Sequence, residues 1–245
     1  MSRFFVSPEN INIKEKKIFI NGSENHHLSR VLRLKQEEEI VVFDGSGKEY
    51  EGTIKEISSQ KTIVEIKRVQ EKREDKQVKM TLAQAIPKKA KIKDIIDKTT
   101  QLGICTIIPI VSTRTIVRPS KEKEKLHLEK WQKIALESSK QCGRTKAPHI
   151  NQITNFKDLI SLSPQYDLAL MPSLLGKRKE LKNIYLHKAK KIIFFIGPEG
   201  GWTKQEIDLA EKNKVILIDL GGNVLKTDTA AIATMAILDF ILCLI

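Results

Sequence analysis

The sequence predicts an α/β protein with a mostly parallel sheet, preceded by a smaller β-rich domain. Two apolar runs, residues 191–196 and 214–220, are typical of interior parallel strands that are covered on both faces. Strand and helix patterns alternate over residues 73–245, which favours helices on both faces of one sheet. Residues 1–72 instead show short strands separated by turn residues. We therefore expect two domains with these boundaries, joined by a charged linker at residues 70–77.

The first domain is expected to consist of short strands joined by turns. Gly45-Ser46-Gly47-Lys48 looks like the end of a phosphate-binding loop, but Glu49 stands where such a loop requires Ser or Thr. We therefore interpret this segment as a hairpin turn. The expected strands are residues 16–20, 39–43, 50–57 and 61–69.

One helix is predicted to interrupt these strands, over residues 26–34. Arg30 and Arg33 lie three residues apart beside an apolar face of this helix. They are either solvated flanking charges or contacts to an anionic partner. The expected apolar face consists of Leu28, Val31, Leu32 and Leu34.

The second domain carries start and stop signals for several helices. Gly103 is placed to end one helix, and Thr203 with Glu206 forms a capping-box pattern at the start of another. Thr227 or Asp228 can cap the last helix. The expected strands are residues 78–86, 104–110, 166–171, 191–196 and 214–220. The expected helices are residues 88–102, 121 to about 143, a segment within 177–190, one from Thr203, and 229–245.

Each of the last two strands ends in a glycine-rich loop, at residues 197–201 and 220–222. In open α/β sheets, ligands bind outside the carboxyl ends of the strands, and glycine lets backbone amides approach a ligand. The first loop, GPEGG, adds the Glu199 carboxylate, which suits a small polar ligand that carries both signs of charge. A tight turn with a surface glutamate is the alternative interpretation. No G-x-G-x-x-G pattern follows a first strand, which argues against a standard dinucleotide site.

The composition favours a polyanionic partner. The chain has 43 Lys and Arg against 30 Asp and Glu, a formal net charge of +13, which suits nucleic acid. Cys105, Cys142 and Cys243 are far apart in sequence, so neither a disulfide framework nor a metal site is expected. The N-terminus lacks the apolar core of a signal peptide, and the apolar run at residues 230–245 is short and interrupted by Asp239. We expect a cytoplasmic protein that does not enter a membrane.

Several motifs together match one known family along nearly the whole chain. The chain resembles the RsmE-type 16S rRNA uridine-N3 methyltransferases of the SPOUT superfamily. The specific part of the match is IGPEGG at residues 196–201, followed by Leu220-Gly221 and by LKTDTA at residues 225–230. Further matching residues are His27-Leu28, Val31-Leu32-Arg33, Gln84-Ala85-Ile86-Pro87-Lys88, Leu102-Gly103, Arg114 and Gln141-Cys142-Gly143-Arg144.

The resemblance implies the fold, the cofactor and the reaction. It implies a PUA-like β-barrel domain that helps to bind RNA, and a SPOUT domain tied into a trefoil knot. It also implies S-adenosylmethionine (SAM) bound in loops of the knot, usually at a homodimer interface. The methyl group would go to N3 of the uridine at position 1498 of 16S rRNA in the 30S ribosomal subunit. The implied cofactor residues are Met171, Pro172, Gly197, Gly200, Gly201, Leu220, Gly221, Leu225 and Thr227.

The resemblance also suggests roles in catalysis and RNA binding. N3 of uridine carries a weakly acidic proton, and Glu199 is the candidate base or orienting group for it. Lys226 is the candidate to stabilise the developing negative charge or to hold a phosphate, and Asp228 is the candidate to position that lysine. Holding donor and acceptor in a near-attack arrangement supplies much of the acceleration of a methyl transfer. The implied RNA contacts are Arg30, Arg33, Lys88, Arg114 and Arg144. The alternative for Arg144 is a charge at a helix C-terminus that the helix dipole favours.

The chain departs from the family pattern at several positions and leaves two other functions to weigh. Lys226 and Asp228 replace residues of the same charge, whereas Gln101 replaces a common acidic residue. Asn223 stands where relatives commonly have an arginine, so a role of that arginine does not carry over to this chain. An RNA-binding protein without turnover is one alternative, and the intact glycine loops argue against it. A small-molecule α/β enzyme with an incidentally basic surface is the other. The excess of Lys and Arg and the separate β-rich domain argue against that one.

Overall fold

The computed structural model describes residues 1–71, 78–89, 91–181, 184 and 189–243. It divides into two compact units, Met1–Asp75 with Ser139–Ala147, and Lys76–Ser138 with Pro148–Ile245. The expected division was into two consecutive segments, so the membership of residues 139–147 in the first unit is a difference. Its physical basis includes an ion pair between Lys140 Nζ and Glu24 Oε1 at 2.8 Å. The Arg3 guanidinium also donates to the Arg144 carbonyl oxygen.

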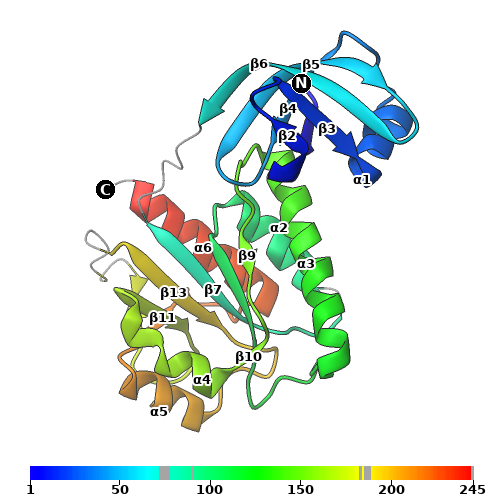
Figure 1. Cartoon of the computed structure of the whole chain (residues 1–245). Coiled ribbons are helices and arrows are strands. Elements are labelled where there is room, and N and C mark those ends of the chain that lie inside the picture. The colour runs from blue at the N-terminus through cyan, green and yellow to red at the C-terminus, as the bar shows by residue number, and fades with distance from the viewer. Residues whose placement is uncertain (72–77, 90, 182–183, 185–188, 244–245) are drawn as a thin grey trace. The chain divides into compact units, whose positions relative to one another are not determined.

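The first unit is built on one curled, six-stranded sheet (Figure 1). The strand order is β1-β4-β5-β6-β3-β2, and every pair except the parallel β1–β4 pair is antiparallel. Alternate strand residues such as Ile18, Val42, Ile54 and Val64 are fully buried and form its core. The strands are β1 (Arg3–Phe5), β2 (Ile11–Asn12), β3 (Lys17–Asn21), β4 (Glu39–Phe43), β5 (Lys48–Ile57) and β6 (Lys61–Glu71).

The hairpin turn predicted between β4 and β5 is confirmed, and Asp44 organises it. Asp44 Oδ1 accepts hydrogen bonds from the backbone and the hydroxyl of Ser46, and Tyr50 Oη donates to Asp44 Oδ2 at 3.0 Å. Burial by itself raises the pKa of Asp44, but these hydrogen bonds outweigh it, so the pKa lies below its usual value. Burial and the neighbouring Asp44 raise the pKa of Tyr50 to about 12.

The helix predicted over residues 26–34 differs in the structure. Helix α1 (Gly22–His26) continues into a π-helical turn, η2 (His27–Val31), and Arg33 then adopts a φ of +54°. A wider turn breaks the 3.6-residue period on which the expected apolar face depended. Leu28 is therefore buried, whereas Val31 and Leu32 are 60% and 41% exposed.

The second unit contains a sheet in which all described strand pairs are parallel. The order is β10-β8-β7-β13-β11-β14-β12, with β9 also paired to β8. This confirms the predicted α/β class. The strands are β7 (Lys79–Ala85), β8 (Thr106–Val111), β9 (His149–Ile150), β10 (Thr154–Asn155), β11 (Leu168–Pro172), β12 (Lys179–Glu180), β13 (Lys191–Ile196) and β14 (Ile216–Asp219).

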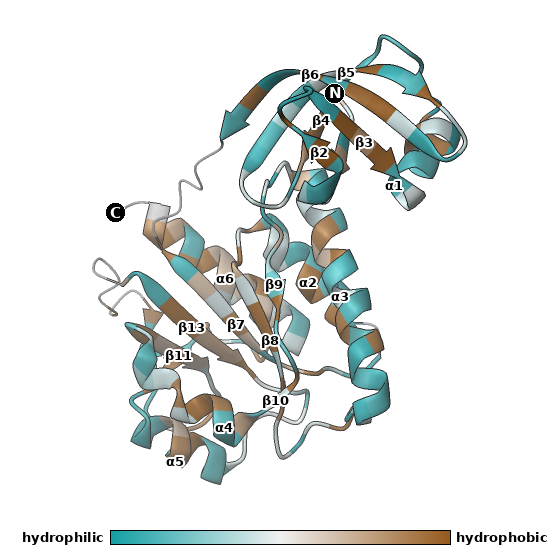
Figure 2. Ribbon diagram, in the orientation of Figure 1, coloured by the Kyte–Doolittle hydropathy of each residue, from teal (hydrophilic) through white to brown (hydrophobic). Residues whose placement is uncertain are grey.

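Helices cover both faces of this sheet (Figure 1). Alternation along the strands sends Leu82 and Phe194 to one face, under α2, α3 and α6, and Ala83 and Phe195 to the other, under α4 and α5. Figure 2 shows the hydrophobic residues concentrated on the central strands and the hydrophilic ones on the outer side of α3. The helices are α2 (Lys91–Gln101), α3 (Lys121–Cys142), α4 (Phe156–Ser161), α5 (Lys204–Lys212) and α6 (Thr227–Cys243), with short 3-10 turns η1 (Pro8–Asn10) and η3 (Ser163–Gln165).

Most predicted boundaries agree with these elements, but the start of α6 does not. The helix begins at Thr227, and the Lys226 carbonyl accepts the Ala230 amide, so Thr227 and Asp228 lie inside the first turn and do not cap it. The capping box of Thr203 and Glu206 is confirmed at the start of α5.

Two other predictions fall partly on residues outside the described ones. The expected linker at 70–77 begins within β6, and residues 72–77 are not among those described. A helix is expected within 177–190, and residues 179–180 of that segment form strand β12 because they pair with β14. Residues 182–183 and 185–188 of that segment lie outside the described part of the chain.

We expect Asp44→Asn to lower the free energy of unfolding by about 1–2 kcal/mol at pH 7, because the charged acceptor of three hydrogen bonds is lost. The pKa of Asp44 is lowered in the folded protein, so its carboxylate stabilises the fold above the unfolded pKa of about 3.9. That contribution disappears as the pH falls through the lowered pKa. Urea unfolding of both proteins at several pH values tests this, and a difference that persists unchanged below about pH 3 would contradict it.

Candidate active site

A cavity of about 520 Å³ lies at the carboxyl ends of β11, β13 and β14. Three loops contribute most of its lining: residues 173–175 after β11, residues 197–202 after β13, and residues 220–221 and 223–226 after β14. Since β11 pairs with both other strands, the carboxyl ends of all three meet at one edge of the sheet. Eight of the nine residues expected to hold the cofactor line the cavity: Pro172, Gly197, Gly200, Gly201, Leu220, Gly221, Leu225 and Thr227.

The ninth residue, Met171, is not at the cavity surface. Its side chain is fully buried and packs in the core on the α4 and α5 face of the sheet. The last residues of a strand alternate between the two faces, which sends Met171 into the core, whereas Pro172 lies at the rim.

The loop at residues 197–202 is a tight turn held by side chains from other elements. The Gly201 amide donates to the Pro198 carbonyl at 2.8 Å, and Gly201 has a φ of +69°, which favours glycine. The Arg114 guanidinium donates to the Gly200 carbonyl at 2.7 Å and to the Trp202 carbonyl at 3.4 Å. A Cβ on Gly200 would lie 3.3 Å from Arg114, so glycine permits this close approach.

The Trp202 indole fills the space behind the same loop. It is 5% exposed, packs against Phe156 with ring centroids 4.9 Å apart, and donates from Nε1 to the Pro172 carbonyl at 3.3 Å. A Cβ on Gly197 would lie 3.1 Å from the indole. The indole therefore joins the loop after β13 to the end of β11.

The buried Glu206 carboxylate connects the loop to the segment after β8. Glu206 Oε2 accepts the Thr203 backbone amide at 2.8 Å, and Thr203 Oγ1 accepts the Glu206 amide. Its other oxygen, Oε1, accepts the Thr113 amide at 2.8 Å. Since Thr113 precedes Arg114, one carboxylate fixes both the start of α5 and the segment whose arginine holds Gly200.

The second glycine loop is shaped by Asp219 at the end of β14. Asp219 Oδ1 accepts the Gly221 amide at 3.1 Å, and Asp219 Oδ2 forms an ion pair with Arg178 at 3.3 Å. Gly221 has a φ of +115°, which L side chains rarely adopt, and no atom lies within 4 Å of where its Cβ would be. The backbone at Gly221 is thus open toward the cavity.

Of the three expected catalytic residues, Glu199 and Lys226 line the cavity and Asp228 does not. Glu199 Oε1 accepts the Lys88 backbone amide at 2.9 Å, which fixes the carboxylate at the rim. Lys226 is exposed immediately before α6.

Asp228 has a different partner from the one expected. Its carboxylate forms an ion pair with Lys91 at 3.2 Å, at the start of α2. Burial alone raises the pKa of Asp228, but the hydrogen bond from Lys91 outweighs it and holds the pKa below its usual value. The carboxylate is therefore ionised at neutral pH and pairs with Lys91 at the start of α2, and its role in positioning Lys226 stays a prediction.

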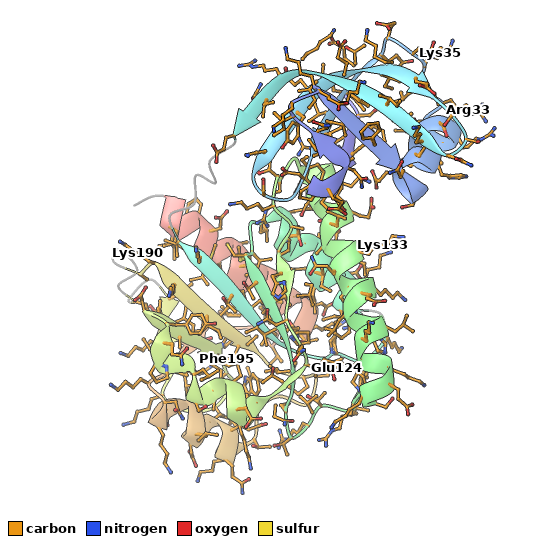
Figure 3. All side chains as sticks on the ribbon, viewed as in Figure 1. Arg33, Lys35, Glu124, Lys133, Lys190 and Phe195 are labelled. Carbon is orange, nitrogen blue, oxygen red and sulfur yellow. The ribbon has the colours of Figure 1, made fainter. Side chains whose placement is uncertain are left out.

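The residues expected to contact RNA are distributed over both units, and one of them, Arg114, has a structural role. Arg30 and Arg33 are exposed in the first unit, where Figure 3 shows Arg33 and Lys35 projecting outward. Lys88 is also exposed. Arg114 clamps the first glycine loop, which sequence reasoning did not foresee, and Arg144 is half-buried in the segment that joins the first unit.

Sequence reasoning missed several residues of the cavity. Ser173, Leu174 and Leu175 line it from the loop after β11, and Leu174 and Leu175 are 61% and 55% exposed. No glycine pattern marks this loop, so only the order of the strands places it beside the other two. Trp202 directly follows GPEGG, and no separate sequence pattern marks it.

Two further properties of the described residues concern metal ions and membranes. Among the residues that the structure describes, no group of three or more His, Cys, Asp or Glu side chains is placed to hold a metal ion. None of the helices in the described part of the chain is long and apolar enough to cross a membrane.

Comparison with known proteins gives consistent matches to both units. Residues 73–239 match the model of an RNA methyltransferase domain, and residues 20–67 match that of an RNA methyltransferase PUA domain. The Ribosomal RNA small subunit methyltransferase E of Mesomycoplasma hyopneumoniae is 32% identical, and the match covers 95% of this chain and 96% of that protein. The protein of the same name from Bacillus subtilis is 26% identical, with coverage of 98% and 96%.

A solved structure matches at the level of the whole fold. It is a Ribosomal RNA small subunit methyltransferase E from Neisseria gonorrhoeae bound to S-adenosyl methionine. The two chains are 29% identical, the TM-score is 0.90, and the match covers 98% of each. The parallel sheet, the glycine loops and these matches agree, and the chain therefore belongs to the ribosomal RNA small subunit methyltransferase E family, with an RNA methyltransferase domain preceded by a PUA domain.

Proposed function

We propose that the protein is a SAM-dependent methyltransferase that methylates N3 of the uridine at position 1498 of 16S rRNA in the small ribosomal subunit. The observation that carries the proposal is the cavity at the ends of β11, β13 and β14, where two glycine loops expose backbone groups. The names of the relatives, and the SAM-bound relative from Neisseria gonorrhoeae, support the cofactor and the rRNA substrate.

The chemistry of the cavity fits SAM. Its volume of about 520 Å³ lies within the usual range of about 300–1,000 Å³ for small-ligand sites. Open space faces the positions where Gly201 and Gly221 would carry a Cβ, so a ligand can approach their backbone groups. Leucines such as Leu175 and Leu225 supply apolar walls. Such a site suits a ligand that has an apolar base and a polar amino-acid end.

We assign the holding of SAM to backbone groups of the two glycine loops and to the rim at Pro172. The bound cofactor would supply a methyl group on a positively charged sulfur, and breaking the sulfur–methyl bond would leave a neutral thioether. Thr227 acts indirectly, because its hydroxyl is engaged with the chain: it donates to the Gly197 carbonyl at 2.7 Å. Arg114 likewise serves the cofactor by fixing the loop that it clamps.

The residues of the chain that act on the uracil are Glu199 and Lys226. The N3 proton must be lost as the new bond forms, and a carboxylate at the cavity rim can accept or orient it. The Lys226 ammonium, exposed at the cavity, can stabilise the negative charge that develops on the uracil oxygens. The Lys88 amide holds Glu199 in place, which limits the reorganisation needed at the moment of reaction.

For the RNA, the exposed Arg30, Arg33 and Lys88 are the proposed phosphate contacts. The net charge of +13 supports a polyanionic substrate. Because the substrate belongs to the ribosome, we also propose that the protein works in the cytoplasm.

We further propose that two copies form a homodimer. Large apolar side chains are exposed on α6, including Phe240 at 67% and Ile237 at 37%. Exposed apolar residues that lie together on one helix favour burial against a partner. A second copy is the partner that the resemblance implies.

The direct test is methylation of small ribosomal subunits that lack the modification. Purified protein, labelled SAM and the subunits are incubated, and the digested rRNA is searched for the methylated nucleoside. N3-methyluridine at position 1498 is the expected product. Protein that binds SAM but transfers no methyl group would overturn the proposal in favour of RNA binding without turnover. A different methylated nucleoside would overturn the assignment of the target.

Replacing Gly221 by Val should weaken SAM binding by at least about tenfold, because the side chain would enter the open space at the second glycine loop and strain its backbone. Isothermal titration calorimetry measures the affinity. Gly222→Ala is the matched control, since it has free space for a Cβ and does not line the cavity. Unchanged affinity of the Gly221→Val protein would remove this loop from the site.

The double substitution Arg30→Ala with Arg33→Ala should weaken RNA binding and reduce the slope of log K against log salt by about 1–2, with SAM affinity unchanged. Binding to a small-subunit rRNA fragment at several salt concentrations tests this. Lys55→Ala is the control in the same unit, because that ammonium is already paired with Glu37 and Glu65. An equal loss of RNA affinity in the Lys55→Ala control would show that the effect comes from net charge alone.

A further inference from the structure

One glutamine interrupts an otherwise apolar face of the central sheet. Along β7 and just beyond it, Met80, Leu82, Gln84 and Ile86 alternate onto the face that packs against α2 and α6. Gln84 is 0% exposed. Burying an amide is costly unless all its polar atoms are hydrogen-bonded, so the residue needs an explanation beyond packing.

The hydrogen bonds of Gln84 are incomplete. Its Nε2 donates to the Ala85 carbonyl at 2.8 Å and to Thr227 Oγ1 at 3.2 Å. Since a carbonyl oxygen can only accept, the bond to Ala85 fixes which way the amide faces. Within the described part of the chain, Gln84 Oε1 has no hydrogen-bond partner. The NH2 group of Gln84 therefore forms stabilising hydrogen bonds, whereas its buried, unbonded oxygen lowers the stability of the fold.

The donor side of Gln84 fixes the direction of the Thr227 hydroxyl. That hydroxyl accepts from Gln84 and donates its single hydrogen to the Gly197 carbonyl at 2.7 Å. With one lone pair occupied by Gln84, the hydrogen points away from Gln84 and toward Gly197. Without this donor, the hydroxyl is free to rotate toward other acceptors. Gly197 is the first residue of the loop at 197–202, and Ile196 before it pairs with Gln84 across the sheet.

We propose that Gln84 is a positioning residue that holds the Gly197 carbonyl, and with it the 197–202 loop, in place through the Thr227 hydroxyl. The consequence for SAM rests on the proposed function, whereas the effect on the loop does not. A buried polar residue that orders a binding loop lowers the stability of the fold but raises the affinity of the site. An apolar residue of similar size at position 84 separates these two effects.

The loop itself is followed without any ligand, by fluorine NMR of protein that carries fluorotryptophan. The chain has two tryptophans, and a Trp131→Phe spectrum assigns the resonance of Trp202, whose indole packs on Gly197. Gln84→Leu should shift and broaden the Trp202 resonance and leave that of Trp131 in place. Leu82→Met, on the same strand and the same face, is the control and should move neither resonance. An unchanged Trp202 resonance in Gln84→Leu would overturn the proposal.

Stability and affinity give the second readout. Gln84→Leu should unfold at the same or a higher urea concentration, because the unpaired oxygen is gone, while SAM affinity falls about tenfold. In a Thr227→Val background, Gln84→Leu should cause no further loss, because both changes break one relay. Additive losses would overturn the relay, and so would a loss of affinity accompanied by lower stability. If the unsubstituted protein binds no SAM, the proposed function fails, and the Trp202 resonance still decides the role of Gln84.

Discussion

The site depends on how one short loop is held. The Gly197 carbonyl accepts a hydrogen bond from the Thr227 hydroxyl of α6. The Gly200 and Trp202 carbonyls accept hydrogen bonds from Arg114, in the segment after β8. The Glu199 side chain accepts the Lys88 amide, and the Trp202 indole donates to Pro172. A loop with three glycines has high conformational entropy when unfolded, so these bonds must offset a large ordering cost. They come from segments spread over much of the second unit, which makes the loop a product of the whole fold.

Some charged groups around the cavity hold its structure together, and others remain able to contact a substrate. Arg114, Asp219 and Glu206 are committed to backbone groups or ion pairs, and Asp228 neutralises Lys91. Committed charges are poor proton carriers, because a change of protonation would break the structure that they support. Among the described residues lining the cavity, the charged groups that remain to contact a substrate are the Lys226 ammonium and the Glu199 oxygen that does not accept the Lys88 amide.

Much of the second unit could be predicted from sequence, because its signals are local. Apolar runs located β13 and β14, the Thr203 and Glu206 spacing located α5, and the two glycine loops located the cavity. What could not be predicted depends on contacts between distant segments. The strand order that brings residues 173–175 to the site, the clamp of Arg114 and the pairing of Asp228 with Lys91 have no sequence pattern. The π-helical turn at residues 27–31 likewise broke a periodic face that the residues suggested. The trefoil knot implied by the resemblance stays a prediction.

The position of β13 in the sheet determines at what stage of synthesis the cavity can form. This strand lies between β7 and β11, and Lys191 pairs with Lys79, so the centre of the sheet joins segments made at very different times during synthesis. Pairing between such distant segments is entropically slow and exposes apolar strands until it is complete. A nascent chain that ends before β13 has β7 and β11 but lacks the strand that lies between them, and α6 is made later still. The protein therefore gains its ligand cavity only when almost all of its residues have left the ribosome, and a truncated chain carries exposed strand edges with no cavity.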